Sequence, residues 1–472
     1  MPNALAYLML LVWPFIALAL FNRLPREKAL IWSILGAYML LPPVANFNLP
    51  GIPDIDKFTL ASICALVLTL FVLGERPGFL PTGIVGRILV VLFVVSPFAT
   101  TLTNPESISM FAAYVPALRL YDSIAYISYQ AIALIPFFLG RHILSKPEGP
   151  KALVQVLVTA GLVYSIPMMI EVRLSPQINV WVYGFFAHDF GQSMRGGGFR
   201  PMVFMPHGLW VAFFALMAAM SALVILRHTP AGGRAKALMI WLYLMLVLVF
   251  CRSTGPMTYA AALIPTILFI GRRWQILIAA SFAIIVITYP ALRGAQLIPL
   301  DAILELAYSY DVERHQSLAF RIRNEEILLD RAAEKPWFGW GGYGRNLILN
   351  PMTGEIETIP DGQWIITLGS YGWMGYIAEF GLLTLPLLLL AREAMLQKTI
   401  RFSPYLSAIA LIYAANLVDL LPNATLIPFS WLMAGTILGH AEVLQANRRQ
   451  EKDTNMEWSA PLQPREKRRT II

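Results

Sequence analysis

Five arginines are the side chains of this sequence best suited to binding an anion. Arg195 and Arg200 lie in Met-Arg-Gly-Gly-Gly-Phe-Arg-Pro, Arg252 follows a long apolar run, and Arg321 and Arg323 lie in Ser-Leu-Ala-Phe-Arg-Ile-Arg. A guanidinium group donates two parallel, charge-assisted hydrogen bonds and stays charged at physiological pH, which suits phosphate or diphosphate. The sequence has no phosphate-binding loop, no His pair at metal-ligand spacing and no nucleophile elbow, so we expect no metal or other cofactor.

Residues 317–334 also have an explanation without a ligand. If this segment is helical, Arg321 can pair with Glu325 and Arg323 with Glu326, as on any solvated helix face. The whole stretch 291–361 has seven basic and eleven acidic residues, so it is not a general cationic surface. Residues that are two positions apart in a helix project about 200° apart around its axis. Arg321 and Arg323 therefore cannot both point into one site.

Asp361 is the carboxylate that could act on a substrate held by these arginines. A carboxylate within hydrogen-bond reach of a hydroxyl group is a general base, which typically contributes on the order of 10²–10⁴-fold in rate. Asp361 also precedes Gln363, where a helix is expected to begin, and an Asp N-cap stabilises a helix by about 1 kcal/mol. Both roles stay open from the sequence.

The elements that must position these side chains are membrane helices. The 472 residues are 57% hydrophobic and 14% charged, with a mean hydropathy of +0.62, which exceeds what a soluble domain carries. In lipid, a chain satisfies its backbone groups by forming helices. Cys64 and Cys251 both lie in apolar runs, so neither a disulfide framework nor a cysteine metal site is expected.

We therefore predict an all-α polytopic membrane protein with about twelve to fourteen transmembrane helices and one large extracytoplasmic loop. The expected spans are 4–22, 29–45, 58–74, 84–103, 123–140, 152–172, 207–226, 236–251, 256–271, 274–290, 364–391, 403–421 and 424–440. The expected parts are an N-terminal bundle of about ten spans (1–290), a loop with short helices (291–361), C-terminal spans (362–440) and a basic tail (441–472).

The orientation follows from the distribution of Lys and Arg. With the N-terminus outside, most of the 36 Lys and Arg residues fall in inside connections and the tail. The loop 291–361 is then extracytoplasmic and the C-terminus cytoplasmic. The tail after 441 has seven basic residues, which would be attracted to anionic membrane lipids.

Three acidic residues in the apolar segments need an explanation. Glu379 and Asp419 are costly near a bilayer core and are expected to be functional or paired. Asp419 lies near the outer end of its span, where Arg252 or a loop arginine could pair with it. Glu171 lies at a span end, and we expect its carboxylate to reach the interface.

Several motifs in the second half of the chain resemble the bacterial O-antigen ligase and polymerase superfamily. The resemblance covers about 250–375 in detail and, upstream, Phe199-Arg200-Pro201 before Pro206-His207-Gly208. Its elements are Cys251-Arg252-Ser253, Ser317-Leu-Ala-Phe-Arg321, Lys335-Pro-Trp-Phe-Gly-Trp-Gly341, Asp361-Gly-Gln-Trp-Ile, and Gly372 with Gly375. The family's ligases usually have His where this chain has Asp361, so the sequence is more similar to the polymerase-like members.

The resemblance implies glycosyl transfer at the periplasmic face of the bacterial inner membrane. The donor would be an undecaprenyl-diphosphate-linked oligosaccharide, used without a nucleotide sugar or metal. Arg200, Arg252 and Arg321 would surround the diphosphate, with Arg323 as a further candidate, and Asp361 would be the base. Arg321 is favoured over Arg323 because it matches the family motif.

Two alternatives to a glycan polymerase remain. One is a ligase that transfers finished glycan to a lipid acceptor. The other is a carrier that flips the lipid-linked sugar without forming bonds, but carriers place ionisable residues near the midplane and use broken helices in both halves. A chain-length regulator or other polysaccharide-assembly proteins are possible partners, and nucleic acid is not expected to bind.

Overall fold

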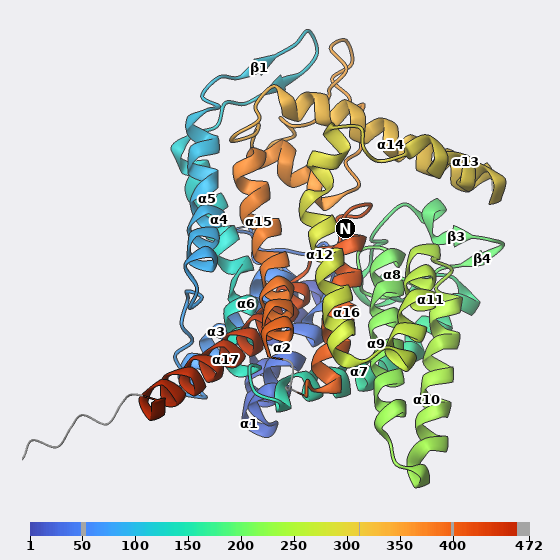
Figure 1. Ribbon diagram of the computed structural model, residues 1–472. Helices are drawn as coiled ribbons and strands as arrows, with labels where there is room; N and C mark the ends of the chain where they lie inside the picture. Colours follow the sequence, from blue (N-terminus) through green and yellow to red (C-terminus); the bar gives the residue numbers. More distant parts are fainter. Residues whose placement is uncertain (49–52, 311, 398–400, 460–472) are drawn as a thin grey trace, which may run out of the picture.

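The computed structural model describes residues 1–48, 53–310, 312–397 and 401–459, which form helices with a few very short strands (Figure 1). The elements are α1 (Ala4–Arg23), α2 (Arg26–Leu40), α3 (Lys57–Phe71), α4 (Ile84–Leu102), β1 (Ile108–Ser109), β2 (Tyr114–Val115), α5 (Leu120–Ala133), α6 (Ile135–Ile143), α7 (Glu148–Leu174), α8 (Ile178–Tyr183), the 3₁₀ helix η1 (Phe190–Ser193), β3 (Met194–Arg195), β4 (Gly198–Phe199), α9 (Gly208–His228), α10 (Ala231–Phe250), α11 (Thr254–Phe269), α12 (Arg272–Gly294), α13 (Leu300–Tyr310), α14 (Val312–Ala333), α15 (Gln363–Leu396), α16 (Pro404–Asp419) and α17 (Pro428–Ser459).

The polytopic helical class is confirmed by helix length and composition. Eight helices among the described residues can cross a membrane by these measures: α1, α4, the continuous pair α5–α6, α7, α9, α10, α12 and α15. α3, α11 and α16 are apolar but shorter. Each of the thirteen apolar runs expected from the sequence overlaps a helix, although 29–45 extends past α2, 424–440 begins before α17 and 123–140 covers both α5 and α6. The expected number of crossings stays a prediction.

The connections between helices gather at two ends of the bundle. At one end, Asn3 donates to the Tyr183 carbonyl, Lys57 to the Phe204 carbonyl and Arg321 to the Pro422 carbonyl. We call this the loop end, because the long connections 175–207 and 295–362 belong to it. At the opposite end, Arg141 pairs with Glu442 and Arg26 with Glu75.

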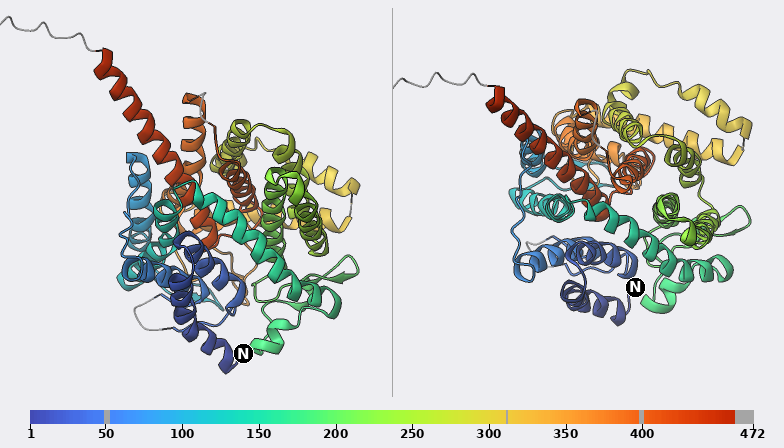
Figure 2. Two further views of the ribbon diagram at one scale, coloured as in Figure 1. Left: turned by 90° about the horizontal axis from the view of Figure 1, so that it is seen from below. Right: turned by 60° about the horizontal axis from the view of Figure 1, so that its bottom comes forward.

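The core lies around α9, the most buried of the eight helices. α9 packs against α7, α10, α11 and α16, while α17 packs along α6 and α15. Small side chains allow close helix approach, as where Gly140 and Gly435 bring α6 and α17 into backbone contact. Figure 2 shows α17 extending away from this bundle and α13 with α14 lying on another side of it.

The segment between α12 and α15 contains α13 and α14 and then an irregular stretch, 334–362. Neither helix is among the eight candidate spans. Figure 1 draws both toward the top of the molecule, the end at which β1 also lies. The segment therefore lies outside the helices that can cross a membrane, and the side on which it lies stays a prediction. The final part of the expected basic tail, 460–472, is outside the described residues.

α15 is bent at Gly372, whose φ of 64° is outside the helical region. The backbone N–H groups of Trp373 and Met374, freed by the bend, donate to the carbonyls of Pro336 and Trp337 at 2.7 and 3.2 Å. A side chain at Gly372 would collide with this turn, because an added Cβ would meet the backbone of residues 336–338. The Pro-Trp-Phe-Gly-Trp-Gly turn therefore replaces the helix hydrogen bonds that the bend removes.

Candidate functional site

Arg200 is a buried cation without a carboxylate partner among the described residues. Its side chain is 3% exposed, and its one hydrogen bond is a long one, 3.5 Å from Nη2 to the Ser253 hydroxyl. Its Nε is buried and has no hydrogen-bond partner. Burial, with the positive charges of Arg195 and Arg321, lowers the pKa of Arg200 to about 10. A buried guanidinium with free donors and cationic neighbours is well suited to an anionic ligand.

Glu171 holds the Arg200 segment in place, a role that the sequence did not indicate. Glu171 is 1% exposed rather than extended to the interface. Its Oε2 accepts the backbone N–H groups of Met202 and Val203 at 2.7 and 2.8 Å, and its Oε1 accepts that of Ile178 at 3.0 Å. Val203 has a strained φ of 51°, so this carboxylate stabilises an unusual backbone turn. The expectation for Glu171 was wrong because its partners come from a distant loop.

Arg252 lies beside Arg200 but binds protein. Its Nη1 donates to the backbone carbonyls of Arg195, at 3.0 Å, and Gly196, in the turn between β3 and β4. An added side chain at Gly198 would collide with the Arg252 guanidinium. Arg252 thus fixes the hairpin that carries Arg195 and leads into Arg200, and its buried Nε has no partner.

His207 caps the N-terminus of α9 at the same place. Its Nδ1 accepts the N–H of Leu209 at 3.0 Å, which leaves Nε2 as the protonated nitrogen facing Gln192 at 3.2 Å. Burial, with Arg200 as the next cause, lowers the pKa of His207 to about 3. His207 is therefore neutral at physiological pH and adds a hydrogen-bond donor, not a charge, to this group.

Arg321 and Asp361 form an ion pair across the loop end. The Arg321 Nε lies 3.3 Å from Asp361 Oδ2, and both side chains are about 30% exposed. Arg321 Nη1 also donates to the Pro422 carbonyl at 3.4 Å. Burial raises the pKa of the Asp361 carboxyl and the Arg321 charge opposes this. The pair keeps one carboxylate oxygen and part of the guanidinium available to a ligand.

The alternative explanations offered by the sequence are wrong for these two residues. Gly362, not Asp361, is the N-cap of α15, and no side chain caps that helix. Arg321 pairs with Asp361 instead of Glu325, and Glu326 pairs with Arg293 instead of Arg323. Longer-range partners have replaced the local pairs that helical spacing suggested.

The remaining predicted residues lie apart from these contacts. Arg323 is exposed on α14 and has no ion pair among the described residues. Glu325 is buried, and burial raises its pKa to about 7 against the opposing charges of Arg293 and Arg321. Asp419 accepts hydrogen bonds from Asn423 and Thr425 at 3.0 and 3.1 Å, so it is satisfied without an arginine.

We refer to Arg195, Arg200, Arg252, Arg321, His207 and Asp361 as the arginine site. It combines the β3–β4 hairpin, the N-termini of α9 and α11, and α14, and it has four cations and one carboxylate. Electrostatic effects link Arg200 to both Arg195 and Arg321. Within the described part of the chain, no three His, Cys, Asp or Glu side chains are placed to hold a metal ion.

Comparison with known proteins finds no matching family model and no matching curated protein sequence.

Proposed function

We propose that this protein is a membrane glycosyltransferase that polymerises oligosaccharide repeat units linked to undecaprenyl diphosphate, in exopolysaccharide or O-antigen synthesis. The observation that carries the proposal is Arg200, a buried cation with open donors and two cationic neighbours. Among the described residues no carboxylate pairs with it, so an anionic ligand would supply the partner. A lipid-linked diphosphate would bring two phosphate groups to Arg200.

The orientation belongs to the same proposal. Consecutive helices connect alternately at the loop end and the opposite end, and the opposite end contains the basic connections near Arg26, Arg141 and Arg272. An excess of Lys and Arg is typical of cytoplasmic connections. The loop end then faces the periplasm of a bacterial inner membrane, where lipid-linked repeats are available.

The proposed reaction needs fixed positive charge and a base. A hydroxyl oxygen of the acceptor sugar forms a bond to the anomeric carbon of the donor. The bond between that carbon and the diphosphate oxygen breaks, and its electron pair stays on the diphosphate. Arg200 and Arg321 stabilise the charge that develops there, in a site already shaped for it. Asp361 accepts the hydroxyl proton.

Purified protein in nanodiscs, given lipid-diphosphate-linked repeat units, tests the function. A ladder of polymers that disappears in Arg200→Ala and in Asp361→Asn supports the polymerase. Transfer of a single block only when a lipid acceptor is added would replace it with the ligase. Movement of the lipid-linked sugar across the bilayer without any new glycosidic bond would replace it with the carrier.

Arg321→Lys refines the role of the second cation. Lysine keeps the charge but cannot reproduce the planar fork of arginine. We expect this variant to lose most polymerisation while keeping its thermal midpoint. Full polymerisation by Arg321→Lys would remove the bidentate contact with phosphate from the proposal.

A further inference from the structure

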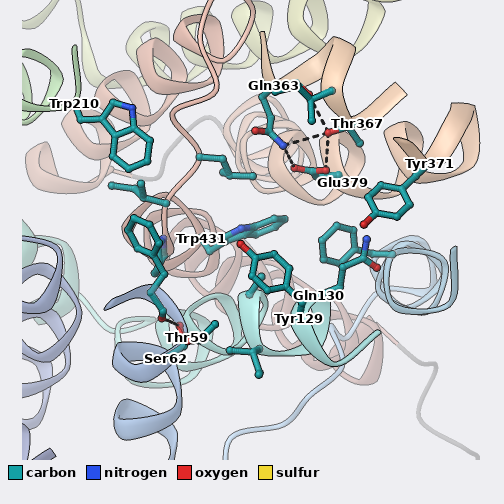
Figure 3. Close-up of a pocket in the computed structure, with 18 residues that line it drawn as sticks. Thr59, Ser62, Tyr129, Gln130, Trp210, Gln363, Thr367, Tyr371, Glu379 and Trp431 are labelled. Atoms are coloured by element: carbon teal, nitrogen blue, oxygen red, sulfur yellow. Dashed lines mark hydrogen bonds between the residues drawn. The ribbon is translucent and has the colours of Figure 1, made fainter. Parts of the chain in front are cut away.

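The helical bundle contains a cavity with a volume of about 290 Å³. Side chains from α3, α4, α5, α9, α15 and α17 line it, and many are aromatic, including Tyr129, Trp210, Tyr371 and Trp431 (Figure 3). This volume is near the lower limit of ligand pockets, which are roughly 300–1,000 Å³. It suits a compact ligand and not a whole isoprenoid chain.

The polar groups of the cavity are arranged around Glu379. The Glu379 carboxylate accepts hydrogen bonds from Gln363 Nε2 at 3.0 Å and from the Thr367 hydroxyl at 2.9 Å (Figure 3). Gln363 and Glu379 are sixteen residues apart, about 24 Å along a straight α-helix. Only the bend at Gly372 lets them meet, so the Pro-Trp-Phe-Gly-Trp-Gly turn also shapes this cavity.

Several polar groups in the cavity have no protein partner. Gln130 Oε1 is buried without a hydrogen bond. The hydroxyl groups of Tyr129 and Tyr371 have no partner among the described residues, and Figure 3 shows both directed into the cavity. Leaving a buried group such as Gln130 Oε1 unpaired costs about 1–3 kcal/mol, which a ligand hydroxyl group would recover, and the two tyrosine hydroxyls offer further hydrogen bonds.

The lining also excludes other classes of ligand. No Lys, Arg or His side chain lines the cavity and Glu379 is its one carboxylic acid, so the lining offers no cation to a phosphate. A hydrocarbon tail would leave Glu379, Gln363 and Gln130 desolvated without new hydrogen bonds. A sugar ring fits both parts of the lining, because its hydroxyl groups bond to amides and carboxylates and its C–H faces pack on aromatic rings.

We propose that this cavity binds one neutral sugar residue of the glycan acceptor, held by Glu379, Gln130 and the two tyrosines. The assignment to an acceptor rests on the proposed function. The cavity is adjacent to the arginine site along the chain at two points. Trp210 lines it within the first turn after His207, and Gln363 lines it two residues after Asp361.

Thiol protection in nanodiscs tests the cavity without any donor substrate. Ala133 lines the cavity, so Ala133→Cys places a thiol there, and Ser62→Cys provides a second reporter on α3. Ala231→Cys, exposed at the opposite end, is the matched control. The two native cysteines are buried, and their background is measured in the parent protein. The rate of modification by methyl methanethiosulfonate is measured by mass spectrometry. It is compared without a sugar and with the methyl glycoside of glucose, galactose, mannose or N-acetylglucosamine.

At least one methyl glycoside should slow modification of Ala133→Cys or Ser62→Cys several-fold and leave Ala231→Cys unchanged. Adding Glu379→Gln should abolish most of that protection, because glutamine keeps the shape but replaces one of the two acceptor oxygens with an N–H donor group. Protection by undecaprenol and by no glycoside would make the cavity a lipid-tail site. Sugar protection that is unaffected by Glu379→Gln, or no protection by any probe, would also overturn the proposal.

These outcomes are independent of the proposed function. Sugar protection in a protein that forms no polymer would keep the sugar site and reject the polymerase. A polymer ladder without protection would keep the polymerase and reject this cavity as the acceptor site.

Discussion

Two buried arginines at the loop end differ in how the protein uses them. Arg345 is 1% exposed, and its guanidinium donates to the carbonyls of Trp340 and Pro116 at 3.1 and 2.8 Å, with Glu106 3.5 Å away. Arg200 is 3% exposed and has a single hydrogen bond of 3.5 Å. Burial is therefore similar, but only Arg345 is satisfied by the fold.

The difference separates a structural cation from a binding one. Arg345 ties the 334–362 stretch to the β1–β2 region, and its removal would leave several acceptors unpaired. Burial of the Arg200 charge costs desolvation energy, and no anion among the described residues offsets that cost. Such an unfavourable arrangement is typical of positions where a function requires the charge. Mutation of Arg200 should therefore lower activity without lowering stability, whereas mutation of Arg345 should lower stability.

Arg200→Ala should produce the largest loss of activity. Removing a fixed cation from a preorganised site typically costs about 10²–10³-fold in rate. The thermal midpoint should stay unchanged or rise, because an unpaired buried charge is removed. Arg345→Ala, the matched control, should lower stability, because its hydrogen bonds to the Trp340 and Pro116 carbonyls, each contributing about 1.5–3 kcal/mol as bonds from a charged donor, are lost. Equal destabilisation by both variants, measured by thermal unfolding in detergent, would erase the distinction.

Asp361→Asn should lower the transfer rate at least about 10²-fold, because asparagine cannot accept a proton. In the parent protein kcat/KM should rise with pH as Asp361 ionises, and burial places this rise above the usual range of an aspartate. In the Asp361→Asn variant, kcat/KM should not show this rise with pH. An active Asn variant with the same pH profile would remove Asp361 as the base.

Glu325→Gln should change the dependence of stability on pH. The folded pKa of about 7 is above the ordinary value for Glu, so the folded state binds the proton more tightly than the unfolded state. Stability should fall as pH rises from about 4.5 to about 7 and level off above. The Gln variant should be as stable as the parent at pH 4.5 and more stable at pH 8, by up to a few kcal/mol. A pH-independent difference in thermal midpoint would contradict this.

Arg252→Ala should produce the smallest effect. The variant loses hydrogen bonds to the β3–β4 turn, each contributing about 0.5–1.5 kcal/mol. Donor KM should rise a few-fold through the loosened hairpin, with kcat nearly unchanged. A loss as large as that of Arg200→Ala would show that Arg252 contacts the diphosphate itself.

The sequence was sufficient to predict a helical membrane protein, but not the contacts between the candidate site residues, whose roles stay predictions. All thirteen expected segments overlap helices, because hydrophobic length is a local property of the sequence. The pairing of Arg321 with Asp361, forty residues away, depends on how α14 and the start of α15 meet, which local spacing does not encode.

Glu171 and Glu379 show the same limit inside the apolar segments. Their acidic side chains stood out in the sequence, but their partners could not be named. Glu171 binds backbone N–H groups about thirty residues away, and Glu379 meets Gln363 only through the bend at Gly372. The sequence signal for the bend was Gly372 itself, together with the Gly-rich turn that now packs against it.

Binding of undecaprenyl diphosphate to the purified protein in nanodiscs tests the central claim most directly, because it isolates the anion from the later chemistry. The parent protein should bind it far more tightly than uncharged undecaprenol, and Arg200→Ala should weaken that binding about 100-fold. Asp361→Asn should bind as well as the parent protein does. Equal affinity for the two lipids, or an Arg200→Ala variant that binds like the parent, would contradict the assignment of Arg200 to the diphosphate.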